Sequence, residues 1–532
     1  MLNRRYLALW GAVLATVGCV ALAEQAYLPR AAVAVPGLLV LLGIYDVLQT
    51  RHAILRNYPI WGHLRFALEF IRPEIRQYFV EGDIDEKPFS RVQRSLVYQR
   101  AKDVVDSRPY GTERDVRSPG HEWISHSLVP THLHDHNFRV VVGGTQRQPY
   151  AMSILNISAM SFGALSGNAI RALNLGASMS QFAHNTGEGS VSRHHREHGG
   201  DLIWGVGSGY FGCRDDHGNF SEVHFLRQAS NPQVKMIEIK LSQGAKPGHG
   251  GVLPGAKVTA EIADARGVAI GETCVSPARH SQFSSPLELL EFVARLRRLS
   301  DGKPTGFKLC VGHPWELFAI GKAMLETGIL PDFIVIDGAE GGTGAAPLEF
   351  VDHIGAPLQD GLLLTHNMLV GMGLRDKIRL GASGKLITAF DIARTLALGA
   401  DWVNMARGFM FAVGCIQAQT CHTGRCPTGV ATQDPVRQRA LDVSDKAQRV
   451  ANFHRNTLLA LKELVEAAGL MHPSQLRAHH IMHRVSREQV QPLSELLEFL
   501  QPDDLLNGQY RTDVFKTWWP RARSDGFAPL PV

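Results

Sequence analysis

The feature that most constrains the fold is a repeated alternation of short apolar runs and glycine-rich segments between about residues 151 and 405. Eight of these runs are typical of β-strands, and helix-like stretches such as 286–299 and 388–399 separate several of them. Alternating strands and helices indicate a parallel sheet, and eight strands suggest that the sheet closes into a barrel. The predicted strands are Ile154–Ala159, Phe182–His184, Met236–Leu241, Thr273–Ser276, Gly306–Val311, Phe333–Ile336, Ile378–Leu380 and Trp402–Met405.

Glycine-rich loops follow nearly every predicted strand, with the sequences SFGALSG, NTGEGS, SQGAKPGHGG, DGAEGGTGA and GASGK. In a (β/α)8 TIM barrel, the loops after the strands form the active face. A doubly wound sheet would instead bind its ligand at one switch point, after a single dominant GxGxxG motif, and no such motif dominates here. The sequence therefore predicts an α/β protein with a TIM barrel over residues 151–470.

The N-terminal segment is apolar enough to cross a membrane. Residues 6–23 and 31–48 form two apolar runs of near-transmembrane length, and arginines flank their outer ends. The positive-inside rule then predicts a transmembrane hairpin over residues 1–50 with both termini in the cytoplasm. A cleaved signal peptide ending at Ala21–Ala23 is the alternative, but the second run would still anchor the chain.

The remaining composition narrows the function further. Residues 51–150 are interpreted as a juxtamembrane segment that leads into the barrel, and residues 471–532 as a helical tail. A net charge of +5 over 532 residues, with no lysine-rich run, argues against nucleic acid as a partner. The 7 cysteines are odd in number and include one local group, which suits a reducing compartment rather than a disulfide framework.

A candidate phosphate site follows the seventh predicted strand, in the segment GASGKL. Ser383, Gly384 and Lys385 offer a hydroxyl, backbone N–H groups and a cation just before a predicted helix. A Gly-Ser-Gly turn alone is most often only a turn. Its place after strand seven of a barrel, where phosphates bind in this fold, favours the phosphate interpretation.

Lys308 lies inside the apolar fifth strand. A buried lysine is costly unless it meets an anion or a polar cofactor, although a lysine near a strand end can also extend its ammonium to solvent. The favoured interpretation is a cation beside a flavin, where negative charge develops on reduction.

The segment GCIQAQTCHTGRCPTG places Cys415, Cys421 and Cys426 in one short loop. Three thiolates in a glycine-containing loop suit an iron–sulfur cluster with three protein ligands. Zinc with His422 as a fourth ligand, or free buried thiols, remain alternatives on spacing alone.

These motifs together resemble the FMN-containing synthase domain of glutamate synthase, and more closely the short FMN-binding, glutamate-synthase-like membrane proteins of bacteria. The resemblance spans roughly residues 150–470. It rests on MSFGALS (160–166), NTGEGS (185–190), IKLSQGAKPGHGGVLPGAKV (239–258), GGTGAAP (341–347), THNMLV (365–370) and the stretch 414–435 ending in CPTGVATQDP.

The resemblance implies cofactors, sites and a location. It implies a 3Fe–4S cluster on the three cysteines and a bacterial inner-membrane protein whose catalytic domain lies in the cytoplasm. Glu188 and Lys246 would be catalytic, and together with Arg266 they would bind 2-oxoglutarate. The implied FMN contacts are Met160, Ser161, Asn185, Lys308, Gly341, Gly342, Thr343, Gly384 and Gly408.

The family reaction implies reductive amination of 2-oxoglutarate with ammonia to give L-glutamate, with electrons passing through the cluster to FMN. The sequence departs from the family in two ways. A glutamine of the substrate loop is Val252 here, and the glutaminase and C-terminal β-helix domains are absent, so ammonia is expected from outside the chain. No dinucleotide-binding fold is evident, which leaves a ferredoxin, a quinone or a flavoprotein as the electron donor.

Three functional hypotheses follow. The first is glutamate synthesis from 2-oxoglutarate, or reduction of a related keto acid. The second is a membrane-associated FMN/Fe–S oxidoreductase that acts on a different substrate, motivated by Val252 and the hairpin. The third is a flavin-binding sensor without turnover, which the cysteine loop argues against, because a cluster serves to carry electrons.

Overall fold

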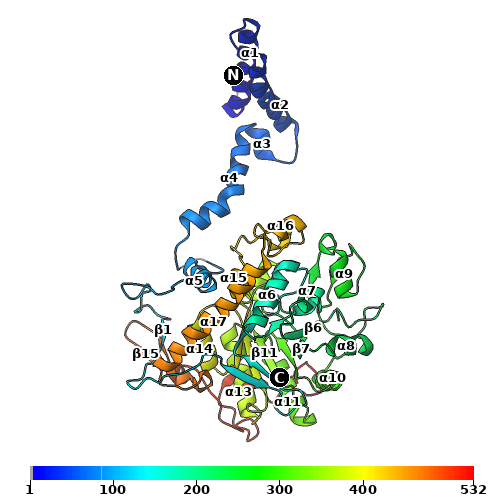
Figure 1. Cartoon of the computed structure of the whole chain (residues 1–532), viewed down its shortest axis with the longest axis vertical. Helices are drawn as coiled ribbons and strands as arrows, with labels where there is room; N and C mark the ends of the chain where they lie inside the picture. Colours follow the sequence, from blue (N-terminus) through cyan, green and yellow to red (C-terminus); the bar gives the residue numbers. More distant parts are fainter. Residues whose placement is uncertain (1–3, 85–86, 532) are drawn as a thin grey trace. The chain divides into compact units, whose positions relative to one another are not determined.

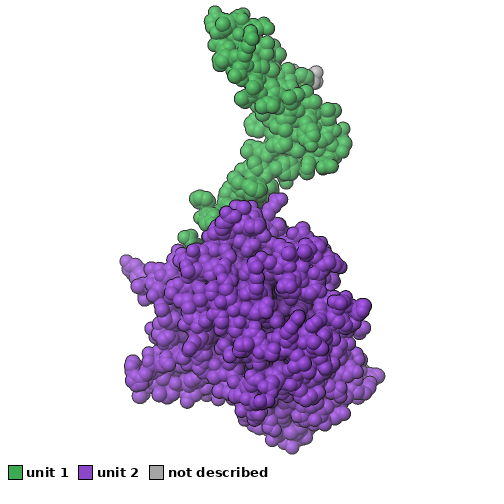
Figure 2. All heavy atoms as spheres, turned by 45° about the vertical axis from the view of Figure 1, so that its right-hand side comes forward, with its two compact units in different colours: residues 1–91 green, residues 92–532 purple. Residues whose placement is uncertain are grey.

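The computed structural model describes residues 4–84 and 87–531. Residues 1–3 of the predicted hairpin therefore lie outside the described residues. Contacts between residues divide the chain into two compact units, Met1–Arg91 and Val92–Val532, which Figure 2 shows in different colours. The following paragraphs treat each unit by itself.

The first unit consists of helices. α1 (Leu7–Glu24) and α2 (Ala34–Leu48) pack together as a hairpin, followed by α3 (Ala53–Asn57), α4 (Trp61–Ile75) and a π-helical turn (Arg76–Val80). The two segments Leu7–Glu24 and Arg30–Leu48 are long and apolar enough to cross a membrane. A Cβ at Gly43 would come within 2.6 Å of Leu9, so a glycine there lets the two helices approach closely.

The second unit contains the predicted barrel, and its strands close in the order β10-β11-β12-β13-β4-β5-β6-β7. All neighbouring strands in it are parallel, and β13 pairs with β4 to close the ring through Val403↔Leu155 and Met405↔Ile157. The TIM-type fold is thus confirmed. The barrel strands are β4 (Leu155–Ile157), β5 (His184–Asn185), β6 (Leu202–Val206), β7 (Val234–Lys240), β10 (Thr305–Leu309), β11 (Phe333–Asp337), β12 (Arg379–Ser383) and β13 (Trp402–Met405).

One predicted strand is wrong. The run Thr273–Ser276 is not part of the barrel, because β9 (Cys274–Val275) pairs antiparallel with β8 (Val252–Leu253) in the long excursion after β7. The third barrel strand is instead β6, in the sequence Leu-Ile-Trp-Gly-Val. Both runs are short and apolar, so the pattern alone does not distinguish a barrel strand from a strand of an excursion.

Helices surround the barrel strands in Figure 1. Their starts follow capping rules; α10, for example, has a capping box between Ser285 and Glu288, and its apolar face is buried. The helices of this part are α5 (Arg91–Ala101), α6 (Gly167–Met179), α7 (Arg193–Arg196), α8 (Glu222–Ala229), α9 (Ala260–Arg266), α10 (Pro286–Leu299), α11 (Pro314–Thr327), α12 (Leu348–His353), α13 (Leu358–Gly371), α14 (Ala389–Ala397), α15 (Arg407–Ala412), α16 (Pro435–Arg439), α17 (Val443–Ala467), α18 (Leu493–Leu496) and α19 (Asp513–Trp518).

Two small sheets lie outside the barrel. β2 (Arg139–Val142) and β3 (Tyr150–Ser153) form an antiparallel pair just before the first barrel strand. The C-terminal segment was predicted to be helical. It also contains a hairpin, formed by β14 (Ile481–Arg484) and β15 (Val490–Pro492). β14 pairs with β1 (Glu122–Ile124), so the segment before the barrel and the segment after it share one sheet.

Candidate active site at the barrel mouth

The residues proposed to bind the cofactor lie at or after the carboxyl ends of the barrel strands. Parallel strands place these ends at one rim, which is the active face of this fold. Met160 and Ser161 follow β4, Asn185 ends β5, and Lys308 lies near the end of β10. The remaining members follow the last three strands: Gly341, Gly342 and Thr343 after β11, Ser383, Gly384 and Lys385 at the end of β12, and Gly408 after β13.

Glu188 forms an ion pair at this rim with a residue that the sequence analysis missed. Its Oε2 lies 3.0 Å from Nζ of Lys240, the last residue of β7, and accepts from the hydroxyl of Ser276 at 3.4 Å. Burial by itself would raise the pKa of Glu188. The charge and hydrogen bond of Lys240, with smaller contributions from Arg266 and Lys246, outweigh burial and lower this pKa below its usual value.

Lys246 and Arg266 bring two further cations toward Glu188. Burial lowers the pKa of Lys246, and the like charge of Lys240 lowers it further. Arg266 is 4% exposed, donates to the carbonyl of Phe162 at 3.2 Å, and lies 5.0 Å from the ring centre of Phe211. Burial lowers its pKa against the opposing charge of Glu188.

A second set of charged side chains, around Lys308, lies inside the barrel. Lys308 is 5% exposed, and its Nζ lies 3.5 Å from Asp337 at the end of β11. Burial disfavours its charged form, but Asp337 and Glu238 outweigh burial and raise the pKa of Lys308. Glu238 accepts from the amide nitrogen of Asn185 at 2.9 Å, and burial raises the pKa of Glu238. The lysine is therefore held inside the protein by carboxylates rather than extended into solvent.

The predicted phosphate loop has a local structure that restricts how it could bind an anion. The hydroxyl of Ser383 donates to Asp337 at 2.6 Å, so this hydroxyl already has an acceptor. Asp391 accepts from the amides of Ile387 and Thr388, which caps the start of α14. Gly384 has φ 152°, a conformation that side chains disfavour. The Ser383 hydroxyl is thus already used inside the protein, and Gly384 holds a backbone conformation that glycine adopts more readily than other residues.

Arg407 connects the glycine loop after β11 to the cysteine loop. Its guanidinium lies where a Cβ on Gly342 would be, so a side chain there would displace Arg407 from this position. Burial lowers the pKa of Arg407, and the nearby sulfurs of Cys415 and Cys421 oppose this shift. One arginine therefore lies beside both the predicted FMN contacts and the predicted cluster ligands.

The three cysteines of the loop lie near enough for their charges to interact. Burial raises the pKa of Cys415 to about 12. A backbone hydrogen bond from Gln417 opposes this shift, and the charges of Cys421 and Cys426 add to it. Burial opposes ionisation of Cys426 as well, but hydrogen bonds from Ala431 and Thr428 lower its pKa. Within residues 4–84 and 87–531, no three His, Cys, Asp or Glu side chains are grouped tightly enough to hold a single metal ion.

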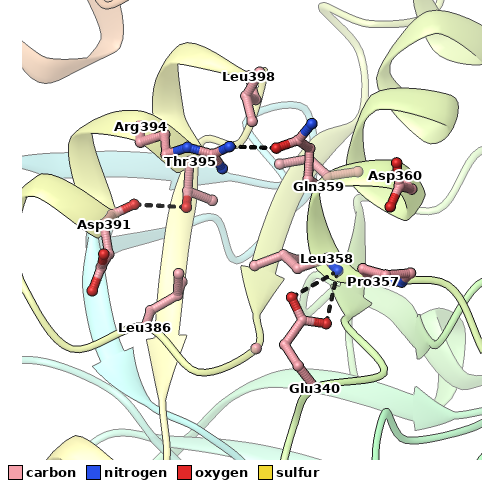
Figure 3. Close-up of a pocket in the computed structure, with 12 residues that line it drawn as sticks. Glu340, Pro357, Leu358, Gln359, Asp360, Leu386, Asp391, Arg394, Thr395 and Leu398 are labelled. Carbon is pink, nitrogen blue, oxygen red and sulfur yellow. Dashed lines mark hydrogen bonds between the residues drawn. The ribbon is translucent and has the colours of Figure 1, made fainter. Parts of the chain in front are cut away.

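A pocket of about 370 Å³ lies beside the phosphate loop, between α13 and α14 (Figure 3). Two of its charged groups, Glu340 and Arg394, already have partners. Both carboxylate oxygens of Glu340 accept from the amide of Leu358, at 3.0 and 2.9 Å, and Arg394 contacts Gln359 and Glu122. The pocket reaches the predicted cofactor residues only at Gly384.

Four charged residues at the rim were not predicted: Glu238, Lys240, Asp337 and Arg407. The signal for two of them was present, because Glu238 and Lys240 alternate with apolar residues inside the predicted strand Met236–Leu241. The argument that selected Lys308, that charge inside an apolar strand needs a partner, applies equally to them.

A comparison with protein-family models identifies the family to which the chain belongs. Residues 128–471 match the model described as the conserved region in glutamate synthase, which is more than half of the chain. The chain belongs to the glutamate synthase family. It is therefore a glutamate synthase-like oxidoreductase, in the class that acts on CH–NH2 donors.

Individual relatives of this family member differ in length. The chain is 39% identical over 483 residues to the glutamate synthase large subunit-like protein YerD of Bacillus subtilis, covering 83% of this chain and 91% of YerD. It is 37% identical over 324 residues to the archaeal glutamate synthase [NADPH] of Methanocaldococcus jannaschii, covering 61% of this chain and 60% of that protein. The chain thus spans about three fifths of the archaeal relative.

Among solved structures, the flavin-binding domain of baker's yeast flavocytochrome b2 is similar with a TM-score of 0.42 and 13% sequence identity. The match covers 85% of this chain and 91% of that chain.

Proposed function

We propose that the chain reductively aminates 2-oxoglutarate to L-glutamate with FMN and a 3Fe–4S cluster, using ammonia from outside the chain. The observation that carries this proposal is the excess of cations around Glu188. Lys240 pairs with it directly, and Lys246 and Arg266 act on its charge. A substrate with two carboxylates complements such a site.

The residues at the rim fit FMN. A Cβ on Gly342 would meet Arg407, and one on Gly384 would crowd Leu358 and Gly338. Because both positions carry no side chain, their backbone N–H groups would be accessible to a phosphate or flavin at the rim. Lys308 would lie beside the flavin ring, and Gly384 with Lys385 would hold the phosphate. When bound, FMN supplies the hydride for the reduction.

The cysteine loop brings together three thiols that would hold a cluster. Cys415, Cys421 and Cys426 interact electrostatically, yet they do not form a compact single-ion group in the described part of the chain. A cluster of several irons spaces its thiolates more widely than one ion does. A 3Fe–4S cluster on these residues would supply single-electron transfer.

The chain's own residues bind and orient the substrate. Lys246 and Arg266 would pair with the two carboxylates of 2-oxoglutarate. Ammonia replaces the keto oxygen, which leaves as water, and the resulting imine takes up two electrons and two protons. The lowered pKa of Glu188 keeps it ionised at neutral pH, so it can accept a proton from the incoming nitrogen. Lys246, whose pKa is also lowered, can return a proton.

Electrons and location complete the proposal. α1 and α2 would anchor the chain in the bacterial inner membrane, with the catalytic unit in the cytoplasm. The electron donor would be a protein or a quinone.

The test uses the full-length protein purified in detergent. We expect flavin and iron–sulfur absorption, and reoxidation of the dithionite-reduced protein by 2-oxoglutarate plus ammonia with formation of glutamate. Glu188→Gln should slow this reoxidation without removing the flavin, because the hydrogen-bonding shape remains and the base is lost. A colourless protein, or a coloured protein that makes no glutamate with any donor, would contradict the proposal.

A second candidate is supported by Val252. It begins β8 in the excursion over Glu188 and is 52% exposed, whereas the resembling family carries a glutamine there. A membrane-associated FMN/Fe–S oxidoreductase acting on another substrate would be the alternative. Faster reoxidation of the reduced protein by a different keto acid or acceptor than by 2-oxoglutarate and ammonia would favour it.

A further inference from the structure

The helix α4 and the π-helical turn after it expose many large apolar side chains. Most of their charged residues, Arg65, Glu69, Arg72 and Arg76, follow one narrow stripe at helical spacing, and Glu74 lies on the opposite side near the end of α4. Most of the remaining surface is apolar, interrupted by few polar groups. The exposed apolar residues are Trp61, Leu64, Phe66, Leu68, Phe70, Ile71, Ile75, Tyr78, Phe79 and Val80.

The start of α4 is fixed to the end of the apolar hairpin. The fully buried carboxylate of Asp46, near the end of α2, accepts from the backbone N–H of Ile60 at 2.9 Å. The same carboxylate contacts Nε2 of His63 in the first turn of α4 at 2.9 Å. Ile60 has φ 67°, which a β-branched residue rarely adopts, and the bond to Asp46 helps to hold it there.

This clamp sets the depth at which α4 begins. α2 is exposed and apolar along its length up to Asp46, so the end of α2 marks the boundary of the apolar layer that it would cross. Because Asp46 holds Ile60 and His63, α4 starts at that boundary. A helix that starts there and is apolar on most sides is suited to lie within the interface, with its charged stripe toward the lipid headgroups.

We infer that α4 lies along the surface of an anionic bilayer, with its apolar face among the acyl chains and its arginines at the phosphates. The inference rests on the membrane anchoring included in the proposed function. Between residues 51 and 80 there are five arginines against Glu69 and Glu74, which favours anionic lipid. The arginine stems can lie along the apolar layer while their guanidinium groups reach the headgroups.

A second copy of the chain is the other occupant that the spacing allows. Trp61, Leu64, Leu68, Ile71 and Ile75 repeat at intervals of three and four, as in a coiled coil. Pairing along that seam would leave Phe66 and Phe70, which lie off it, in water, and Phe70 is 81% exposed. The bilayer covers both the seam and these two rings, so the observations favour lipid.

The experiment uses the full-length protein in vesicles of phosphatidylcholine and phosphatidylglycerol, with a trace of phosphatidylcholine that carries a photoreactive diazirine on its acyl chain. After illumination, lipid adducts are mapped by mass spectrometry. We expect adducts in residues 7–48 and also in residues 61–80. Replacing phosphatidylglycerol in the vesicle by phosphatidylcholine, with the same trace probe, should lower the yield in 61–80 severalfold and leave 7–48 unchanged.

The decisive variant places charge on the apolar face. Leu68→Glu with Ile71→Glu should lower adducts in 61–80 about tenfold, since carboxylates partition poorly among acyl chains. Both side chains are exposed, so the variant should fold. The matched control, Glu69→Gln on the charged stripe, should not lower the yield, because it removes a negative charge that faces the phosphates.

The outcomes separate this inference from the anchoring beneath it. Adducts in 7–48 but none in 61–80 would overturn the surface helix and leave the hairpin in the membrane. Crosslinks between copies through 61–80, in place of lipid adducts, would assign the face to a second chain and overturn the inference. Adducts in neither segment would overturn the anchoring itself, and the surface helix with it.

Discussion

The substrate side of the rim and the cysteine loop differ in how far the polypeptide completes them. On the substrate side, Glu188 pairs with Lys240 and Lys308 pairs with Asp337, so folding alone brings these opposite charges together. In the cysteine loop, burial raises the pKa of Cys415 and Cys421, and the neighbouring sulfurs add to this shift. Their thiolates would repel one another unless a cation lay between them.

This difference indicates two ways of building a redox site. The ion pairs between strands are formed by folding alone, because strand register sets the positions of their side chains. Ligand thiols gain their partner only when metal binds, and binding then releases their protons. The structure of the substrate side should therefore persist without a cofactor, whereas the structure of the cysteine loop should depend on its cluster.

The largest predicted effect tests the cysteine loop. Cys421→Ser should abolish iron and acid-labile sulfide in the purified protein, because three thiolates are the minimum for the proposed cluster. Flavin content should remain, since the rim on the substrate side is formed without the cluster. Iron analysis and absorption spectroscopy check both, and Cys19→Ser, in helix α1, is the control that should keep its iron. Full iron content in Cys421→Ser would contradict the assigned ligands.

The second prediction tests the substrate side of the rim, where buried charges form ion pairs. Lys308→Met should lower the free energy of unfolding by about 3–5 kcal/mol, because it leaves buried carboxylates without their cation. Lys303→Met is a matched control. Lys303 is 6% exposed, but its ammonium bonds to the carbonyls of Ala229 and Asn231 rather than to a carboxylate. Its loss should cost about 1–2 kcal/mol. Equal losses in urea denaturation would mean that the partnered charge of Lys308 has no special role.

The barrel could be predicted from the sequence because apolar runs and glycine-rich loops are local patterns that repeat along the chain. Seven of the eight strands were located from apolar runs, and the loops after them from glycines. Leu202–Val206 was missed and Thr273–Ser276 wrongly included, because whether a short strand joins the ring depends on distant pairing that no local pattern encodes. The same limit explains the C-terminal hairpin, whose partner β1 lies more than 300 residues earlier.

The sequence named candidate site residues but not the side chains that contact them. Lys308 was expected beside a cofactor, and the structure adds Asp337 and Glu238 as the anions that hold it in place. Ser383 was expected at a phosphate, and its hydroxyl instead donates to Asp337. Pairings of this kind join adjacent strands, so they become visible only when the register of the barrel is known.

The third prediction tests whether the turn at Gly384 keeps its conformation without a ligand, as we expect for the substrate side of the rim. Gly384→Ala should cost about 1–3 kcal/mol, because φ 152° is strained for alanine and its Cβ would lie 3.2 Å from the Cβ of Leu358. Gly344→Ala, where a Cβ meets nothing within 4 Å, is the control and should cost less than about 0.5 kcal/mol. If the two variants unfold at the same urea concentration, the turn is not held in its conformation without a ligand.

The smallest predicted effect separates two carboxylates on the substrate side of the rim by the sign of their pH dependence. The pKa of Glu188 is lowered, so the unfolded chain binds more protons at this group, and its stabilising contribution is lost as pH falls below the usual value near 4.5. The pKa of Glu238 is raised by burial, so the folded chain binds more protons, and this group makes the protein less stable as pH rises above the same value.

Glu188→Gln should therefore flatten the acid side of a plot of unfolding free energy against pH, and Glu238→Gln should flatten the side above it. Urea denaturation between about pH 3 and pH 7 measures both slopes, and each variant serves as the control for the other, since each removes one carboxylate from the same rim. If both variants change the same side, the two carboxylates titrate as one coupled group. Glu188, in the loop after β5, and Glu238, in β7, would then share their protons rather than titrate separately.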